Sequence, residues 1–154
     1  MRTMLLSFKP DVYSRILSGD KIFEHRRTFP VEPVKAYLYV SRPVSSITGI
    51  VYLDNRHSLD DWLNEYAYDI DAISRISEYK KNYNYAMEIP KFIETNSISL
   101  TELRAKFNFL VPRSYYYIDN SELLSYLEKK LIPTGHVVEH SNYSSINSTQ
   151  ICKM

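Results

Sequence analysis

The sequence predicts a single domain of the α+β class, and three features lead to that prediction. Short segments with alternating or continuous apolar residues, typical of strands, alternate with segments of helical spacing. Capping residues, prolines and glycines mark the ends of these segments. A chain of 154 residues is long enough for one ordinary domain with its own core. We expect this domain to span 1–139, and a flexible polar tail, rich in Ser and Asn, to span 140–154.

The first half of the chain contains one predicted helix among several strands. Pro10 opens the helix and Gly19 ends it, as expected for a first helical residue and a C-cap. Gly49 falls inside a strand pattern and predicts a bulge or a close backbone approach. The predicted strands cover 4–8, 21–29, 35–42 and 47–53.

The second half begins with an acidic segment. Residues 54–78 contain seven acidic and two basic residues, and their apolar residues keep helical spacing. We expect 54–84 to form a helical insert that covers one end of the sheet, and 54–78 to offer a surface to a protein partner. After it, the pattern predicts a strand at 85–89, an edge or bulged continuation after Pro90, and helices at 99–107 and 121–131.

Composition excludes several classes of site. The single cysteine, Cys152, excludes an internal disulfide and a cysteine-based zinc site. The four histidines show no metal-ligand spacing, so we expect neither a metal nor another cofactor. No apolar run approaches the roughly 20 residues that span a bilayer, which predicts a cytoplasmic domain without a membrane partner. A net charge of +1 means that an anionic ligand needs a local basic patch.

One short stretch concentrates charged residues after the glycine that ends the first helix. On a strand, Glu24 and Arg26 share one face. Lys21 lies in the turn, where the alternation of the strand is not yet fixed, and it can join them. Such a cluster offers cationic donors for an anion and one carboxylate acceptor for an amine or amide. A solvent-exposed ladder of ion pairs is the alternative structural interpretation.

The order of these residues resembles a known family. Gly19-x-Lys21-x-x-Glu24-x-Arg26 matches in full the G-x-K-x-x-E-x-R signature of ASCH (activating signal cointegrator homology) domains, which belong to the PUA-like superfamily. The flanking strands and helices, from residue 4 to residue 131, resemble the bacterial and phage branch of that family. The resemblance implies a small mixed or antiparallel β-barrel with flanking helices.

The resemblance also implies a cleft beside the first helix that binds RNA or a nucleotide-like ligand. Lys21, Glu24 and Arg26 would line it, and Gly19 would form the turn that lets them converge. Some superfamily members are small amidohydrolases that resemble this chain at Lys21 and Arg26. They carry a threonine where this chain has Glu24, so their hydroxyl chemistry does not transfer directly.

Aromatic residues supply further ligand-binding candidates, because bases stack on aromatic rings. Arg113, Ser114 and Tyr116 lie in an extended segment that we expect to contribute to the site. Residues 79–85 interleave lysines with tyrosines, a pattern of single-strand binders that is also typical of a polar loop.

Three functions remain open from the sequence. The first is a binding module for RNA or a modified nucleotide. The second is a small hydrolase acting on a nucleoside-type amide or on RNA, with Glu24 as general base and Lys21 polarising a carbonyl. The third is a phage or regulatory interaction domain that uses 54–78.

Overall fold

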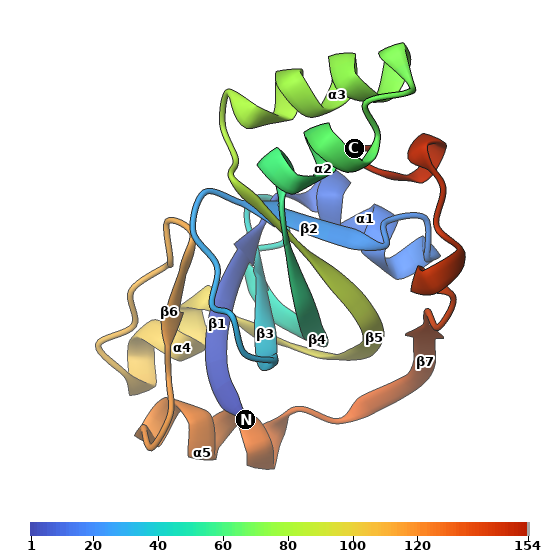
Figure 1. The fold of residues 1–154 in the computed structure, drawn as a ribbon. Coiled ribbons are helices and arrows are strands. Elements are labelled where there is room, and N and C mark those ends of the chain that lie inside the picture. Colours follow the sequence, from blue (N-terminus) through green and yellow to red (C-terminus); the bar gives the residue numbers. More distant parts are fainter. Residues whose placement is uncertain (154) are drawn as a thin grey trace.

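The computed structural model describes residues 1–153, which form a curled sheet flanked by helices (Figure 1). The helices are α1 (Pro10–Ser18), α2 (Leu59–Glu65), α3 (Ile70–Lys80), α4 (Leu100–Lys106) and α5 (Glu122–Lys130). The strands are β1 (Arg2–Phe8), β2 (Phe23–Arg26), β3 (Val34–Val40), β4 (Ser46–Ser58), β5 (Tyr85–Ser99), β6 (Tyr115–Tyr117) and β7 (Pro133–Glu139). The predicted α+β class with a barrel-like sheet is confirmed.

The strand order is β2-β5-β4-β3-β1-β6, with β7 also paired to β5. β1 and β3 run parallel, and the other pairs are antiparallel. β5 has 15 residues and curls, so that its beginning pairs with β2 and its middle with β7. Pro90 lies between these two stretches, beside a register shift with β4, where a missing N–H interrupts no ladder. This confirms the bulged continuation predicted after Pro90.

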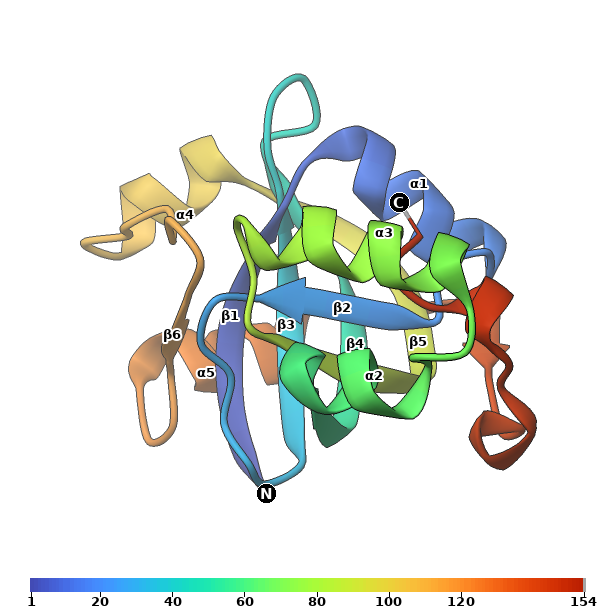
Figure 2. The same ribbon diagram turned by 45° about the horizontal axis from the view of Figure 1, so that its top comes forward.

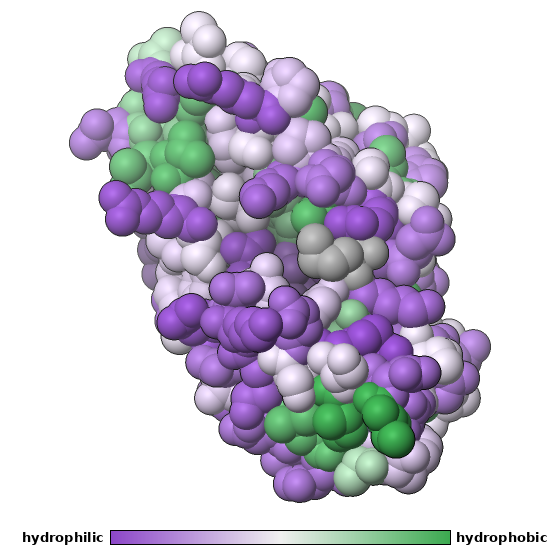
Figure 3. All heavy atoms as spheres, turned by 90° about the horizontal axis from the view of Figure 1, so that it is seen from above, coloured by the Kyte–Doolittle hydropathy of each residue, from purple (hydrophilic) through white to green (hydrophobic). Residues whose placement is uncertain are grey.

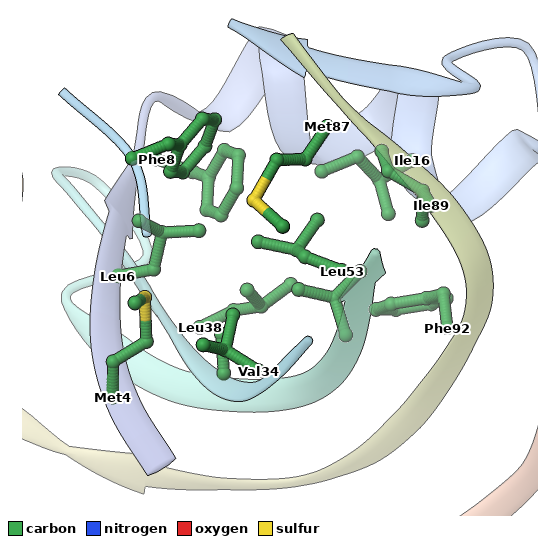
Figure 4. Packing of buried hydrophobic residues seen from close by; sticks show 13 residues of the cluster. Met4, Leu6, Phe8, Ile16, Val34, Leu38, Leu53, Met87, Ile89 and Phe92 are labelled. Atoms are coloured by element: carbon green, nitrogen blue, oxygen red, sulfur yellow. The ribbon is translucent and has the colours of Figure 1, made fainter. Parts of the chain in front are cut away.

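The main core fills the inside of the curled sheet. Figure 4 shows apolar side chains from β1, β3, β4 and β5 converging there, with Ile16 of α1 at one side. Gly49 allows this close packing, because a Cβ at that position would lie 2.8 Å from the Phe92 ring. The β4–β5 register also shifts between Ile47 and Gly49, so both predictions for this glycine are confirmed.

Two further apolar clusters surround the sheet. α4 and α5 supply Leu103 and Leu127 to a cluster on the side of Leu5. α2 and α3 lie on either side of β2 in Figure 2 and bury Trp62 and Ile76 beside it. The two helices of the insert therefore pack against β2.

The structure differs from the sequence prediction at several places, and the strand predicted at 21–29 is limited to Phe23–Arg26. β4 continues to Ser58, five residues beyond the predicted strand, and β7 forms where no strand was predicted. The end of the chain is packed rather than free: Ile151 and Cys152 are 0% and 2% exposed. The Tyr143 hydroxyl hydrogen-bonds to the backbone of Ile22 and Ile89. These contacts join distant segments, and two adjacent apolar residues in a polar stretch give no periodic signal.

The face over α2 and α3 is largely hydrophilic, with hydrophobic residues gathered toward two ends (Figure 3). A protein partner for 54–78 stays a prediction. Of the helices within residues 1–153, none has the length and apolar character needed to cross a membrane.

Candidate functional site

The turn between α1 and β2 places Lys21. Gly19 has a φ of 86°, and its N–H donates to the Ile16 carbonyl at 3.1 Å. A Cβ at Gly19 would lie 3.3 Å from the Val138 side chain, so both the backbone conformation and the close approach favour glycine. The Lys21 N–H donates to the Arg15 carbonyl at 3.0 Å and keeps the chain against the helix end. Lys21 therefore precedes β2 without following its alternation.

The three charged residues of the motif meet in one buried cluster. Lys21 Nζ lies 3.6 Å from Glu24 Oε1, and Arg26 Nη2 lies 3.3 Å from Glu24 Oε2. The side chains of Lys21, Glu24 and Arg26 are 7%, 6% and 13% exposed. A solvent-exposed ladder of ion pairs does not describe this arrangement, because all three side chains are largely withdrawn from water.

Glu24 is held in its ionised form. Burial is the largest single effect and by itself raises the pKa of this carboxyl group. The charges of Lys21 and Arg26 and a 2.9 Å hydrogen bond from the His25 N–H together outweigh burial, so the pKa of Glu24 lies below its ordinary value. A carboxylate with two cationic partners and a lowered pKa is a poor general base at neutral pH. Its position is that of a fixed counter-ion.

Arg26 joins three parts of the chain. Its Nη1 donates to the carbonyl and hydroxyl oxygens of Ser114, both at 3.2 Å. Its Nη2 donates to the Ser7 carbonyl at 2.7 Å and to Glu24 at 3.3 Å. Both terminal nitrogens are therefore used within the protein, which makes Arg26 better placed to fix the site than to hold a ligand.

Lys21 differs from Arg26 in this respect. At 3.6 Å its contact with Glu24 is an ion pair and too long for a hydrogen bond. The ammonium group carries three donors, and Lys21 lines a cleft with a volume of about 580 Å³. Lys21 thus offers a charge fixed by Glu24 and hydrogen-bond donors available to a ligand.

The cleft is cationic and partly aromatic. It lies beside α1 and β2 and also receives residues from the end of α3 and from the segment before β6. Its cationic lining residues are Lys9, Lys21, Arg26, Arg27 and Arg113. Its acidic lining residues are Asp11 and Glu24, and its aromatic ones are Phe8, Tyr79 and Tyr83.

The structure separates the other predicted candidates. Arg113 and Ser114 line the cleft together with the motif residues. Tyr116 does not, because its strand position pairs with Leu5 and its ring packs against the cluster beneath α4 and α5. Its hydroxyl donates to the Leu110 carbonyl at 2.5 Å. None of the three residues of β6 lines the cleft, and the sequence did not show that the cleft lining ends at Ser114.

His25, which was not among the predicted site residues, points away from Glu24 toward the aromatic residues of the insert. It is 5% exposed, and its ring centroid lies 4.8 Å from that of Tyr79 and 6.1 Å from that of Tyr83. Neither ring nitrogen has a hydrogen-bond partner within residues 1–153. Burial, then the Lys21 charge, lower the pKa of His25 to about 3 against the opposing effect of Glu24, so the ring is neutral at physiological pH.

Comparison with known proteins supports the fold and the family. An ASCH domain-containing ribonuclease of Zymomonas mobilis is 27% identical over 128 residues, covering 77% of this chain and 85% of the relative. The crystal structure of an ASCH protein from Zymomonas mobilis aligns with a TM-score of 0.66 at 22% identity, over 85% of this chain and 96% of that one. Over most of its length the chain is similar to ASCH domain proteins in sequence and in fold.

A point variant of the Zymomonas ASCH protein gives the same TM-score of 0.66 at 21% identity, and this chain covers its whole length. No family model matches the sequence. In this chain the residues that match the ASCH signature lie at the turn from α1 into β2 and along β2. Within residues 1–153, no group of three or more His, Cys, Asp or Glu side chains is arranged to hold a metal ion.

Proposed function

We propose that this domain binds single-stranded RNA in the cleft beside α1 and β2. The observation that carries the proposal is the local charge: five cationic and two acidic side chains line the cleft of a chain whose net charge is +1. Cationic grooves with aromatic side chains are typical of proteins that bind single strands. The name of the Zymomonas relative, a ribonuclease, favours RNA over DNA.

The cationic residues of the cleft have different roles in this proposal. Lys9, Arg27 and Arg113 are exposed and attract the phosphate backbone from solvent. Lys21 lies deeper and donates to one phosphate or carbonyl oxygen. Glu24 and Arg26 hold that ammonium group in place, so little side-chain freedom is lost when the ligand binds.

Equilibrium binding of a short single-stranded RNA tests the proposal. We expect Lys21→Met to weaken binding at least about tenfold, and to reduce the slope of log K against log salt by about 0.7 if Lys21 contacts one phosphate. Lys129→Met removes the same charge from an exposed position on α5 outside the cleft and is the matched control. Equal affinities for wild type and both variants, or no binding by wild type, would contradict the proposal.

A second function, RNA cleavage, is favoured by one arrangement in the cleft. Lys21 is a buried cation with available donors, and such a group stabilises the negative charge that develops when a 2′-hydroxyl attacks its neighbouring phosphate. In that step a bond forms between the 2′-oxygen and phosphorus, and the bond from phosphorus to the 5′-oxygen breaks. The 2′-hydroxyl loses a proton and the leaving 5′-oxygen gains one.

Cleavage is tested with labelled RNA and its all-deoxy counterpart. We expect products from RNA alone, and their loss in Lys21→Met. Glu24→Gln distinguishes two roles for this carboxylate. A counter-ion predicts that binding and stability fall together, whereas the general base predicted from the sequence requires binding to persist while cleavage stops. Intact RNA after prolonged incubation with wild type would leave binding as the function.

A further inference from the structure

The end of α3 and the turn after it form part of the cleft wall. Tyr79, Asn82 and Tyr83 line the same cleft as Lys21 and Arg27, although they belong to the helical insert of residues 54–84, called the acidic insert below. This is the segment in which lysines and tyrosines alternate in the sequence. The fold brings Tyr79 and Tyr83 of this segment to the cleft, but not its lysines or Tyr85.

Two hydrogen bonds fix this wall beside the cationic residues. The Asn84 N–H donates to the Arg26 carbonyl at 3.2 Å, and Asn84 Nδ2 donates to the Arg27 carbonyl at 3.1 Å. Tyr83 directly precedes Asn84 and therefore lies near the end of β2 and near Arg27, which follows that strand. An RNA strand whose phosphates contact Arg27 would therefore pass close to the Tyr83 ring.

The Tyr83 ring is supported from within the protein. Its centroid lies 6.1 Å from that of His25 and 5.9 Å from that of Tyr79. It is half-buried, so one part of the ring contacts these side chains and another part meets the cleft. Beside it, the exposed Asn82 amide carries both a donor and an acceptor.

We propose that residues 79–83 form a nucleobase subsite, in which Tyr83 stacks on one unpaired base and the Asn82 amide hydrogen-bonds to its edge. His25 and Tyr79 act as positioning residues that hold the Tyr83 ring toward the cleft. This inference rests on the proposed function, since it names the part of the RNA strand that this wall contacts. It also gives the acidic insert a role that its charge alone does not indicate, because a stacked base is uncharged.

The test compares two probes of equal length and charge: a single-stranded oligoribonucleotide and its abasic counterpart. Tyr83→Ala is expected to bind the base-bearing strand roughly 5- to 150-fold more weakly than wild type does, the range measured for loss of one stacking partner. It should leave the affinity for the abasic strand unchanged. Tyr83→Phe keeps the ring and should retain wild-type affinity for both strands.

Two controls separate stacking from other effects. Arg27→Ala should weaken the binding of both probes, because Arg27 contacts the phosphate backbone that the two probes share. Tyr68→Ala removes a 76% exposed tyrosine of the same insert from outside the cleft and should change neither affinity. Thermal melting of each variant checks that it is folded.

A measurement on the wild-type protein needs no variant. An oligoribonucleotide carrying 2-aminopurine should lose fluorescence on binding, because stacking quenches that base. Binding without quenching at every position of the label, or equal losses of both probes in Tyr83→Ala, would overturn the inference and leave the proposed function standing. Failure of wild type to bind either probe would overturn the proposed function itself.

Discussion

The two faces of β2 differ in how their polar groups are satisfied. On one face, the charges of Glu24 and Arg26 meet each other and the hydrogen-bonding groups of Ser7 and Ser114. On the other face, the two nitrogens of His25 are enclosed by aromatic rings and lack partners within the described residues. A strand of four residues thus separates an ionic network with hydrogen-bond partners from a histidine ring whose nitrogens have none within the described residues.

The difference shows which face resists change. A buried carboxylate is tolerated only while its cations remain, so the Glu24 face depends on each of its members. A buried imidazole without partners contributes no hydrogen bonds, so an apolar ring of similar shape can replace it. A buried polar group without a partner lowers stability, so its presence beside a cleft is consistent with a role in binding.

The largest expected effect comes from breaking the ionic face. Arg26→Met removes one partner of Glu24 and the contacts to Ser7 and Ser114. We expect the free energy of unfolding, measured by urea titration at pH 7, to fall by about 3–5 kcal/mol. Arg27→Met, at the exposed end of the same segment, should change it by less than about 0.5 kcal/mol. Equal effects of the two substitutions would show that the network around Glu24 does not stabilise the fold.

The next effect concerns the apolar cluster behind the aromatic face. Ile151 is fully buried with Trp62 and Ile76, in the segment that the sequence predicted to be a flexible tail. Ile151→Ala should lower the free energy of unfolding by about 2–5 kcal/mol, because it leaves a cavity in that cluster. Ile132→Ala, at a 64% exposed position, is the control and should have little effect. A change below about 0.5 kcal/mol for Ile151→Ala would instead support the flexible tail predicted from the sequence.

The smallest effect at neutral pH is expected on the aromatic face. His25→Phe should change the free energy of unfolding at pH 7 by less than about 1 kcal/mol. A loss of several kcal/mol at that pH would mean that the imidazole makes a contact that this structure lacks.

The free energies of unfolding of wild type and His25→Phe should diverge as the pH falls. The pKa of His25 is about 3 in the folded chain and about 6.5 when unfolded, so the unfolded state binds the extra proton between these values. The contribution of the neutral His25 ring to the free energy of unfolding is therefore complete above pH 6.5. It is lost toward pH 3, by up to about 1.4 kcal/mol per pH unit. Unfolding titrations from pH 7 to pH 4.5 should show this slope in wild type and a flatter one in His25→Phe. Parallel slopes would show that His25 does not titrate between the two states.

Local signals in the sequence predicted most of the fold. Pro10 and Gly19 mark the ends of α1, and Gly49 marks the close approach to Phe92. The helix ends could be predicted because each depends on the conformation of one residue and its near neighbours. The glycine at position 49 indicated that another segment comes close, but not that this segment is β5. The missed strand β7 depends instead on pairing with β5, some forty residues earlier, and carries no strong local pattern.

The candidate site shows the same division. The spacing of Gly19, Lys21, Glu24 and Arg26 predicted a convergent cluster, and the turn after α1 brings these side chains together. The sequence did not distinguish Arg26, whose terminal nitrogens bind Ser7 and Ser114, from Lys21, whose donors remain available. That distinction requires the position of β1 and of the segment before β6.

By itself, the sequence determined the secondary structure around the motif and the residue types that meet there, because short-range geometry follows from backbone preference and side-chain period. Only the tertiary structure decided that Lys21 lines a cleft, that Tyr116 lies outside it, and that the end of the acidic insert joins its wall. The physical reason is that burial, ion pairing and hydrogen-bond satisfaction are set by neighbours distant in the chain.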